Sequence, residues 1–262
     1  MCLIVFAWQQ HPALPLLMAA NRDEFHARPA SGATYWEDSP EVLAGRDLQA
    51  GGTWLGVSRS GRIAAITNIR DPAAGDRSAL RSRGELTHNF LAGGASPETY
   101  LAEIADRIGD YQGFNLLVGD RQSLWYLHGN AADKTPPRAL APGIYALSNA
   151  ALDVPWPKVR RAREQLHNAL QGHDAPDHDA LRSCLGDRSL ADAQALLEQN
   201  LDGEMARQLS AQFIVTEHYG TRCCTTLRQH AHGLLEFQEQ RFDARGELAG
   251  SDTFELNTQN PD

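Results

Sequence analysis

The second residue of the chain, Cys2, carries a side chain that can act as a nucleophile. It follows Met1 and begins an apolar run that ends at Trp8. Methionine aminopeptidase removes Met1 when the next side chain is small, so we expect a mature chain with a free α-amino group on Cys2. An α-amino group titrates at about 7.7 to 8.0 and a thiol at about 8.5, so the amine can serve as the base for its own sulfur. The alternative is a small apolar residue at the start of a strand.

Three asparagines stand where apolar segments end. Asn21 begins the run Asn21-Arg22-Asp23-Glu24, Asn68 closes a second apolar segment, and Asn149 precedes a long helical pattern. A side-chain amide donates hydrogen bonds from a neutral group, which suits the stabilisation of an oxyanion. Asparagine is also an ordinary turn residue. The three side chains therefore form an oxyanion site if they converge on one rim, and otherwise mark turns.

The elements that must position these residues follow from apolar periodicity and glycine punctuation. Hairpins are predicted for residues 2–8 with 14–20, 51–57 with 62–68, and 113–120 with 124–128, and further strands for 144–149, 212–217, 223–228 and 234–242. Helices are predicted for residues 82–91, 96–108, 157–170 and 190–201, with a loop at 171–179. This order of sheet, helices, sheet, helices, sheet fits an α+β fold with two antiparallel sheets and helices outside them.

Composition limits the class of protein. The chain has 262 residues, of which 42% are hydrophobic and 22% charged, which suits one large domain or two intimately packed ones. We expect a single domain over residues 1–262, with a loosely ordered tail from about residue 251. The net charge of -9 argues against a nucleic-acid partner or an anionic membrane surface. No run approaches the roughly 18 apolar residues of a membrane span, so no transmembrane segment is predicted.

Four cysteines, at positions 2, 184, 223 and 224, show no metal-binding spacing. Cys223 and Cys224 are neighbours in a predicted strand, where consecutive side chains point to opposite faces. This is a poor disulfide framework and predicts a reducing, cytoplasmic compartment. No metal ligands are predicted.

The chain also resembles the NRDE family, which includes the transport and Golgi organization proteins of animals. The family is in turn similar to cysteine-type N-terminal-nucleophile (Ntn) hydrolases, the choloylglycine hydrolase and penicillin V acylase group. This resemblance implies a four-layer αββα sandwich. The residues that carry it, in chain order, are Cys2, Asn21-Arg22-Asp23-Glu24, Gly45-Arg46-Asp47, Gly51-Gly52-Thr53-Trp54-Leu55-Gly56, Thr67-Asn68-Ile69-Arg70, Ser82-Arg83-Gly84, Leu147-Ser148-Asn149 and Tyr219-Gly220-Thr221-Arg222.

The resemblance implies catalytic roles for five residues. Cys2 matches the nucleophile, and Asp23 matches the carboxylate that orients the terminal amine. Asn68 and Asn149 match two pocket asparagines, one of which would bind the oxyanion together with a backbone N–H. Arg222 is the candidate for a late arginine near the thiolate.

Four residues are predicted to contact the substrate: Asn21, Arg22, Arg70 and Trp54. The chain departs from the acylases at one position, because it has Ala20 where they carry an arginine. Arg22 lies two positions later, on the same face of a strand. It is therefore the candidate to supply the missing charge.

These residues predict an Ntn-type cysteine hydrolase that cleaves an amide or thioester bond of a small acylated substrate and requires no cofactor. The alternative is a protein that binds haem, acyl-CoA or another lipid on the same scaffold, since the family has been associated with both. A haem would need an axial ligand such as His26 or His88. An acyl-CoA would place its phosphates on arginines.

Overall fold

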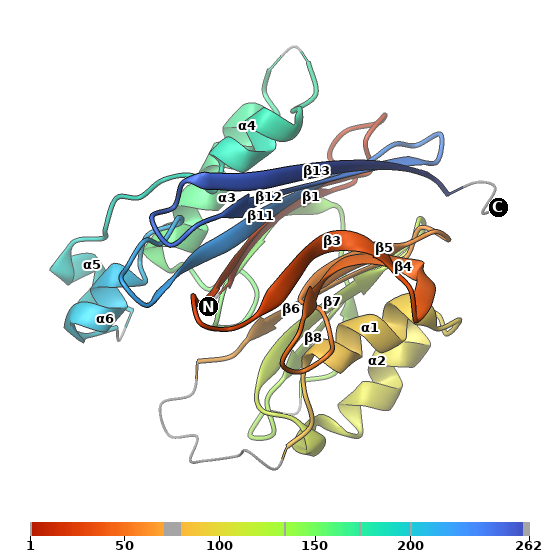
Figure 1. The fold of residues 1–262 in the computed structure, drawn as a ribbon, viewed down its shortest axis with the longest axis horizontal. Coiled ribbons are helices and arrows are strands. Elements are labelled where there is room, and N and C mark those ends of the chain that lie inside the picture. The colour runs from red at the N-terminus through yellow and green to blue at the C-terminus, as the bar shows by residue number, and fades with distance from the viewer. Residues whose placement is uncertain (1, 71–79, 134, 173, 200, 259–262) are drawn as a thin grey trace. The chain divides into compact units, whose positions relative to one another are not determined.

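The computed structural model describes residues 2–70, 80–133, 135–172, 174–199 and 201–258. The chain divides into two compact units that alternate along the sequence. The first comprises Met1–Ala27, Pro142–Ser148 and Leu152–Glu255, and the second Arg28–Ala141, Asn149–Ala151 and Leu256–Asp262. Each unit contains one antiparallel sheet with its own helices (Figure 1).

The sheet of the first unit has six strands in the order β10-β1-β2-β11-β12-β13. Their bounds are Cys2–Trp8 for β1, Leu16–Phe25 for β2, Gly143–Leu147 for β10, Tyr219–Gln229 for β11, Leu234–Phe242 for β12 and Leu248–Asn257 for β13. The central strands β1 and β2 are buried along nearly their whole length, which explains why both of their faces are apolar. The polar residues Asn21, Arg22 and Asp23 continue β2 beyond this apolar part.

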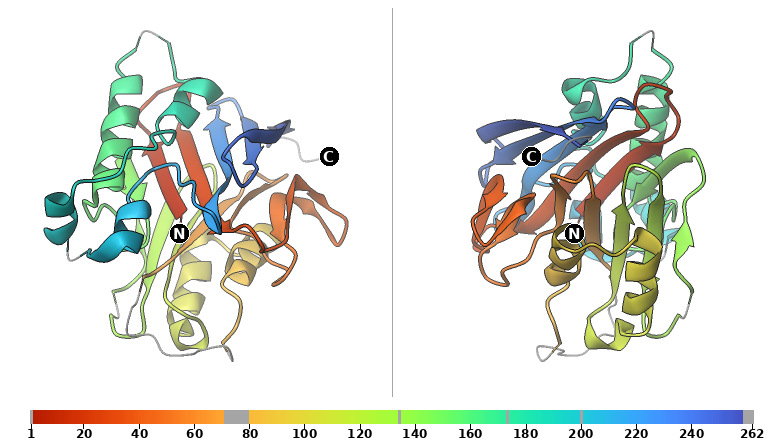
Figure 2. Two further views of the ribbon diagram at one scale, coloured as in Figure 1. Left: turned by 60° about the vertical axis from the view of Figure 1, so that its left-hand side comes forward. Right: turned by 90° about the vertical axis from the view of Figure 1, so that its right-hand side faces the viewer.

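The helices of the first unit are α3 (Pro157–Ala169), α4 (His178–Ser183), α5 (Ala193–Leu197) and α6 (Gly203–Gln208). Pro157 begins α3, where a missing backbone N–H costs nothing. Val159, Ala162 and Leu166 form the buried stripe of α3, which packs on β1 and β10 (Figure 2). Helix α4 packs on β11 and β2. No helix in the described part of the chain is long and apolar enough to cross a membrane.

The second unit has a seven-stranded sheet in the order β3-β4-β5-β6-β7-β8-β9. The bounds are Ala30–Trp36, Ser39–Asp47, Leu55–Ser58, Ile63–Asn68, Phe114–Gly119, Leu124–Gly129 and Arg138–Ala139. Helices α1 (Gly84–Ala92) and α2 (Pro97–Ala105) pack on this sheet and bury a core that includes Phe90, Leu101 and Phe114. A short 3-10 helix, η1, follows at Ile108–Asp110. Ser96 caps α2, its hydroxyl accepting from the backbone N–H of Thr99, and Pro97 follows at the first helical position.

The predicted α+β class with two antiparallel sheets is confirmed, as are the three hairpins. The strand predicted for residues 212–217 is wrong: Phe213 is buried, but its N–H and that of Gln212 bond to the carbonyl of Asp187 instead of a strand. Helix α5 is shorter than the predicted 190–201, and α4 begins inside the predicted loop. The expected loose tail begins instead as the paired strand β13, which runs to Asn257.

Candidate functional site

Cys2, Arg22 and Cys223 form a row across three neighbouring strands. Cys2 is opposite Arg22 in the β1–β2 ladder, and Arg22 is opposite Cys223 in the β2–β11 ladder. Residues directly opposite one another in antiparallel strands project from the same face of the sheet. The thiol of Cys2 and the guanidinium of Arg22 therefore share a face. The predicted removal of Met1 concerns a residue outside the described part of the chain.

Asp23 follows Arg22 in β2, so its side chain projects from the other face of the sheet. This buried carboxylate accepts a hydrogen bond of 2.7 Å from Thr221 Oγ1, and its backbone carbonyl accepts one of 2.6 Å from the Tyr219 hydroxyl. Burial raises the pKa of Asp23, while the positive charge of Lys158 and the Thr221 hydrogen bond lower it. The last residues of β2 are thus held in place by β11.

The thiol of Cys2 is half-buried, and opposing influences act on its acidity. Burial raises the pKa of the thiol, and the negative charge of Asp23 adds to this rise. A hydrogen bond from the backbone N–H of Asp23 and the positive charge of Arg22 lower the pKa. Burial outweighs the groups that favour the thiolate, so the pKa of Cys2 is raised overall. Two of the groups that favour the thiolate, the Asp23 N–H and the Arg22 guanidinium, come from consecutive residues of β2.

Arg222 is the extra residue of a β-bulge, since the ladder shifts register between Thr221 and Cys223. A bulge of this kind redirects a side chain. Here Nη1 of Arg222 donates to the carbonyl oxygens of Phe25 at 2.9 Å and His26 at 3.2 Å. Burial lowers the pKa of Arg222, and the neighbouring charge of Arg22 lowers it further. The two arginines thus lie close enough to influence each other at this end of β2.

Ser148 and Asn149 lie at the point where the chain passes from the first unit to the second. The Ser148 hydroxyl donates to the backbone carbonyl of Cys2 at 2.8 Å. Nδ2 of Asn149 donates to the carbonyl of Asn68 at 2.7 Å, and the carbonyl of Asn149 accepts from the Arg70 N–H at 2.8 Å. Three predicted site residues, Asn68, Arg70 and Asn149, are therefore in contact within the second unit.

The remaining predicted contacts, Asn21 and Trp54, have clear structural surroundings. Nδ2 of the buried Asn21 donates to the carbonyl oxygens of Leu185 at 3.0 Å and Gln212 at 2.9 Å, so this side chain anchors two loops on the face that carries Asp23. The indole of Trp54 covers Gly45 so closely that a Cβ there would lie 2.4 Å from the ring. A role for either residue in binding a substrate stays a prediction.

Two buried charged residues escaped the sequence analysis. Lys158, in the first turn of α3, acts on Asp23 as described above, but nothing in the sequence around Pro157 distinguishes it from a surface lysine. Glu239 of β12 lies beside Cys223, and burial together with the charge of Glu239 raises the pKa of that thiol well above its ordinary value. A single glutamate within an alternating strand gives no signal of burial.

His26 and His88, considered as axial ligands for a haem, both have partners within the protein. Nε2 of His26 is 3.1 Å from the carbonyl oxygen of Thr216. Nε2 of His88 is 2.9 Å from the hydroxyl of Ser39, and its ring stacks on Trp36. Among the described residues, no group of three or more His, Cys, Asp or Glu is arranged to hold a metal ion.

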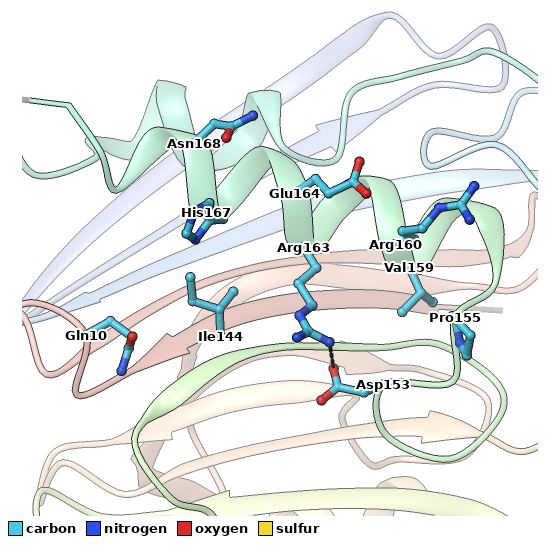
Figure 3. A pocket seen from close by; sticks show the side chains of 10 residues that line it. All are labelled: Gln10, Ile144, Asp153, Pro155, Val159, Arg160, Arg163, Glu164, His167 and Asn168. Atoms are coloured by element: carbon cyan, nitrogen blue, oxygen red, sulfur yellow. Dashed lines mark ion pairs between the residues drawn. The ribbon is translucent and has the colours of Figure 1, made fainter.

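A groove of about 650 Å³ lies beside α3 in the first unit (Figure 3). Arg160, Arg163 and His167 line it from one side of the helix, and Ile144 lines it from β10. Arg163 is 3.8 Å from Asp153 across the groove. None of the predicted site residues lines this groove, so it is separate from the Cys2 row.

Comparison with known proteins identifies the family of the chain. The model of the family described as Transport and Golgi organisation 2 matches residues 1–244. The chain belongs to this family. It is 34% identical over 259 residues to the Transport and Golgi organization protein 2 homolog of Bos taurus, an alignment that covers 92% of each chain. The predicted family is therefore confirmed.

Solved structures of Ntn hydrolases resemble the fold. The C2A mutant of a conjugated bile acid hydrolase from Clostridium perfringens has a TM-score of 0.57 at 9% identity, covering 100% of this chain and 94% of the hydrolase. A penicillin V acylase from Agrobacterium tumefaciens has a TM-score of 0.51 at 11% identity, covering 98% and 86%. At this sequence identity the similarity establishes the fold alone.

Proposed function

We propose that this protein is a cysteine hydrolase of the Ntn type that cleaves an amide or thioester bond of a small acylated substrate, in the cytoplasm. The observation that carries the proposal is the position of Cys2. Arg22 lies directly opposite Cys2 in the ladder, and the charge of Arg22 together with the backbone N–H of Asp23 lowers the pKa of the Cys2 thiol against the effect of burial. A thiol that can ionise at the end of a strand is the central requirement of this chemistry.

In the proposed reaction, the Cys2 thiolate attacks the substrate carbonyl carbon and forms a C–S bond. The carbonyl π electrons move to oxygen, and the oxyanion is stabilised by an amide donor, for which Asn149 and Asn68 are the candidates. The tetrahedral intermediate then re-forms the carbonyl and expels the amine or thiolate, which takes up the proton that the α-amino group of processed Cys2 accepted from the thiol when the thiolate formed. Water hydrolyses the resulting thioester, which releases the acid and restores the thiol.

Asp23 is proposed to hold the α-amino group in place. Its carboxylate is buried and fixed by the Thr221 hydroxyl, so its position is defined before a substrate binds. Preorganisation of this kind avoids rearrangement during the reaction.

Arg22 is proposed to replace the arginine that the acylases carry at the position of Ala20. Ala20 is opposite Ile4, two residues along β1 from the nucleophile, whereas Arg22 is opposite Cys2 itself. The shift by two positions keeps the charge on the same face and moves it towards the sulfur. The bile acid hydrolase also supports the assignment of the nucleophile, because its C2A mutation names a cysteine at the same position, 2.

The intact mass of the purified protein, before and after brief exposure to a cysteine-directed acylating probe, tests the proposal. We expect loss of Met1 and one fast adduct that disappears in Cys2→Ala. The adduct should persist in Cys184→Ala, because the Cys184 thiol is buried in the native protein. A screen of amide and thioester substrates follows, with Cys2→Ala as the inactive reference. Turnover that survives Cys2→Ala would contradict the proposal.

The four cysteines are free thiols, which supports the reducing compartment in the proposal. Titration with haemin and with palmitoyl-CoA separates the hydrolase from a ligand-binding protein. Tight binding without turnover, in a protein that retains Met1, would favour the binding function.

A further inference from the structure

A row of buried polar side chains crosses the sheet of the second unit. Asn115 of β7 is opposite Thr67 of β6 on one side and His128 of β8 on the other. Asn115 is fully buried, and Tyr126, two residues before His128 on the same face of β8, is nearly so. Polar groups are costly to bury unless hydrogen bonded, so a row of this kind has to be satisfied internally.

Asn115 uses all of its hydrogen-bonding capacity. Nδ2 donates to Thr67 Oγ1 at 3.0 Å and to the carbonyl of Ala150 at 2.9 Å. Oδ1 accepts from the Tyr126 hydroxyl at 2.7 Å and lies 2.8 Å from Nδ1 of His128. Because a carbonyl only accepts, the contact with Ala150 fixes the orientation of the amide. His128 must therefore carry its proton on Nδ1.

The row is hydrogen bonded to the segment that contains Asn149. Nδ2 of Asn115 donates to the carbonyl of Ala150, the residue after Asn149. Asn149 itself donates to the carbonyl of Asn68 and accepts from the N–H of Arg70. Three hydrogen bonds thus fix the consecutive residues Asn149 and Ala150. Two of these bonds are made with Asn68 and Arg70, which follow Thr67 closely in the chain.

We propose that Asn115, supported by Tyr126 and His128, is a positioning residue that fixes Asn149 for its part in the hydrolysis. The proposal rests on the proposed function, in which Asn149 stabilises the oxyanion. A donor contributes fully only when it already points at the position that the charge will occupy. Asn115 is suited to this task because its amide cannot rotate without losing up to four hydrogen bonds.

Substitutions of Asn115 and Tyr126 perturb the row to different extents. Asn115→Asp replaces the two donors by acceptors and places a carboxylate oxygen against the Ala150 carbonyl. Asn115→Ala removes the side chain, and Tyr126→Phe removes a single donor to Oδ1 while keeping the ring. Thr87→Val is the matched control, because the buried Thr87 hydroxyl donates to the Thr53 carbonyl in the same unit without a bond to this row.

Amide hydrogen exchange gives a readout that needs no substrate. The N–H of Arg70 is protected by the carbonyl of Asn149, so it reports whether this segment stays in place. We expect faster exchange at Arg70 in Asn115→Ala and Asn115→Asp, a smaller change in Tyr126→Phe, and none in Thr87→Val. Unchanged exchange at Arg70 in both Asn115 variants would overturn the proposal.

A double-mutant cycle tests the link to the reaction. Removal of an oxyanion donor costs about 10²- to 10³-fold in kcat in typical hydrolases, so we expect Asn115→Ala to lower kcat about tenfold with little change in KM. In an Asn149→Ala background, Asn115→Ala should have no further effect, because the two residues act as a unit. Losses that simply multiply would show that Asn115 does not act through Asn149.

The cycle also separates this proposal from the proposed function. Turnover in Cys2→Ala would refute the hydrolase, and with it any role of Asn149 in that reaction. Turnover that needs Cys2 and Asn149 but shows no coupling to Asn115 would refute only the positioning role.

Discussion

Cys2 and Arg22 are direct partners at the end of the β1–β2 ladder, with Cys223 beyond Arg22 on the same face. The register of an antiparallel pair is fixed wherever its strands are buried, because a slip by one residue would turn every side chain to the other face. In β2 such a slip would turn the buried side chains of Asn21 and Asp23 away from their hydrogen-bond partners. These polar contacts therefore also determine the pairing of Cys2 with Arg22.

Arg22→Gln should raise the pKa of the Cys2 thiol, because the positive charge of Arg22 lowers it in the native protein. Only the thiolate reacts with alkylating agents, and each unit of pKa changes the thiolate fraction about tenfold well below the pKa. We expect slower alkylation of Cys2 by iodoacetamide at pH 7 and a rate profile displaced to higher pH. Peptide mass mapping restricts the measurement to this cysteine.

Arg161→Gln is the matched control, since Arg161 pairs with Asp187 in the same unit and does not influence the Cys2 thiol. It should leave the alkylation profile unchanged. Equal profiles for the native protein and Arg22→Gln would contradict the proposed role of Arg22.

Thr221→Val should displace the acid limb of the pH–rate profile, the pH range in which the rate of Cys2 acylation falls, to higher pH. The hydrogen bond from Thr221 lowers the pKa of Asp23, which burial raises, so its loss should raise that pKa further. Activity that needs the carboxylate is lost as the pH falls through this pKa, and the loss should therefore begin at a higher pH in the variant. Asp23→Asn should acylate slowly at every pH.

The comparison uses the rate of probe labelling between pH 4 and pH 8, with Thr87→Val as the control for loss of a buried hydroxyl. An acid limb that stays in place in Thr221→Val would show that Asp23 does not control the amine.

Apolar patterning predicts much of this fold because burial dominates its strands. The run from Cys2 to Trp8 is almost wholly buried, and the strand after Arg62 ends at Asn68 as its composition indicates. Residues 212–217 also include apolar side chains, and Phe213 and Ile214 are buried, but this segment is a loop. The N–H of Phe213 bonds to the carbonyl of Asp187, and the N–H of Ile214 bonds to the side chain of Thr221. Apolar composition therefore predicts that a segment is buried. It does not predict whether the segment forms a strand, because that depends on backbone hydrogen bonds to residues distant in sequence, such as Asp187.

The candidate site was predictable only where a motif marked it. Cys2, Asp23 and Asn149 came from position and family resemblance, whereas Lys158 and Asn115 lie in ordinary amphipathic or strand patterns. The roles proposed for them depend on contacts between segments far apart in sequence, such as that of Asn115 with Ala150. A single sequence carries no record of such contacts.

Gly52→Ala should destabilise the second unit strongly. A Cβ on Gly52 would lie 2.3 Å from the carbonyl carbon of Gly84, a backbone atom that cannot give way like a side chain. The same two segments are joined by a hydrogen bond of 3.2 Å from the Thr53 N–H to the Gly84 carbonyl. Overpacking of this kind costs about 1 to 3 kcal/mol.

Gly94→Ala is the control, because a Cβ on Gly94 would meet no atom of the described residues within 4 Å and the backbone there needs no left-handed conformation. Urea unfolding should show a lower midpoint for Gly52→Ala and a nearly unchanged midpoint for Gly94→Ala. Similar midpoints for both variants would mean that the Gly52–Gly84 contact adapts without cost.

Two half-buried histidines should make the protein less stable in mild acid. Burial lowers the pKa of both His128 and His178. A histidine of the unfolded chain takes up a proton as the pH falls through about 6.5, while the folded protein resists until a lower pH. The unfolded state then binds more protons, so the free energy of unfolding falls from about pH 6.5 down to the folded pKa and is flat above this window.

His128→Gln and His178→Gln separate the two contributions. Each variant should lose part of the pH dependence between pH 5 and pH 7, whatever its stability at pH 8. The negative charge of Glu236, 3.4 Å from Nε2 of His178, partly compensates protonation of that ring, and the charge of Asp133 does the same for His128. Urea midpoints at pH 5, 6, 7 and 8 measure the slopes, and slopes equal to that of the native protein in both variants would show that neither histidine is held neutral by the fold.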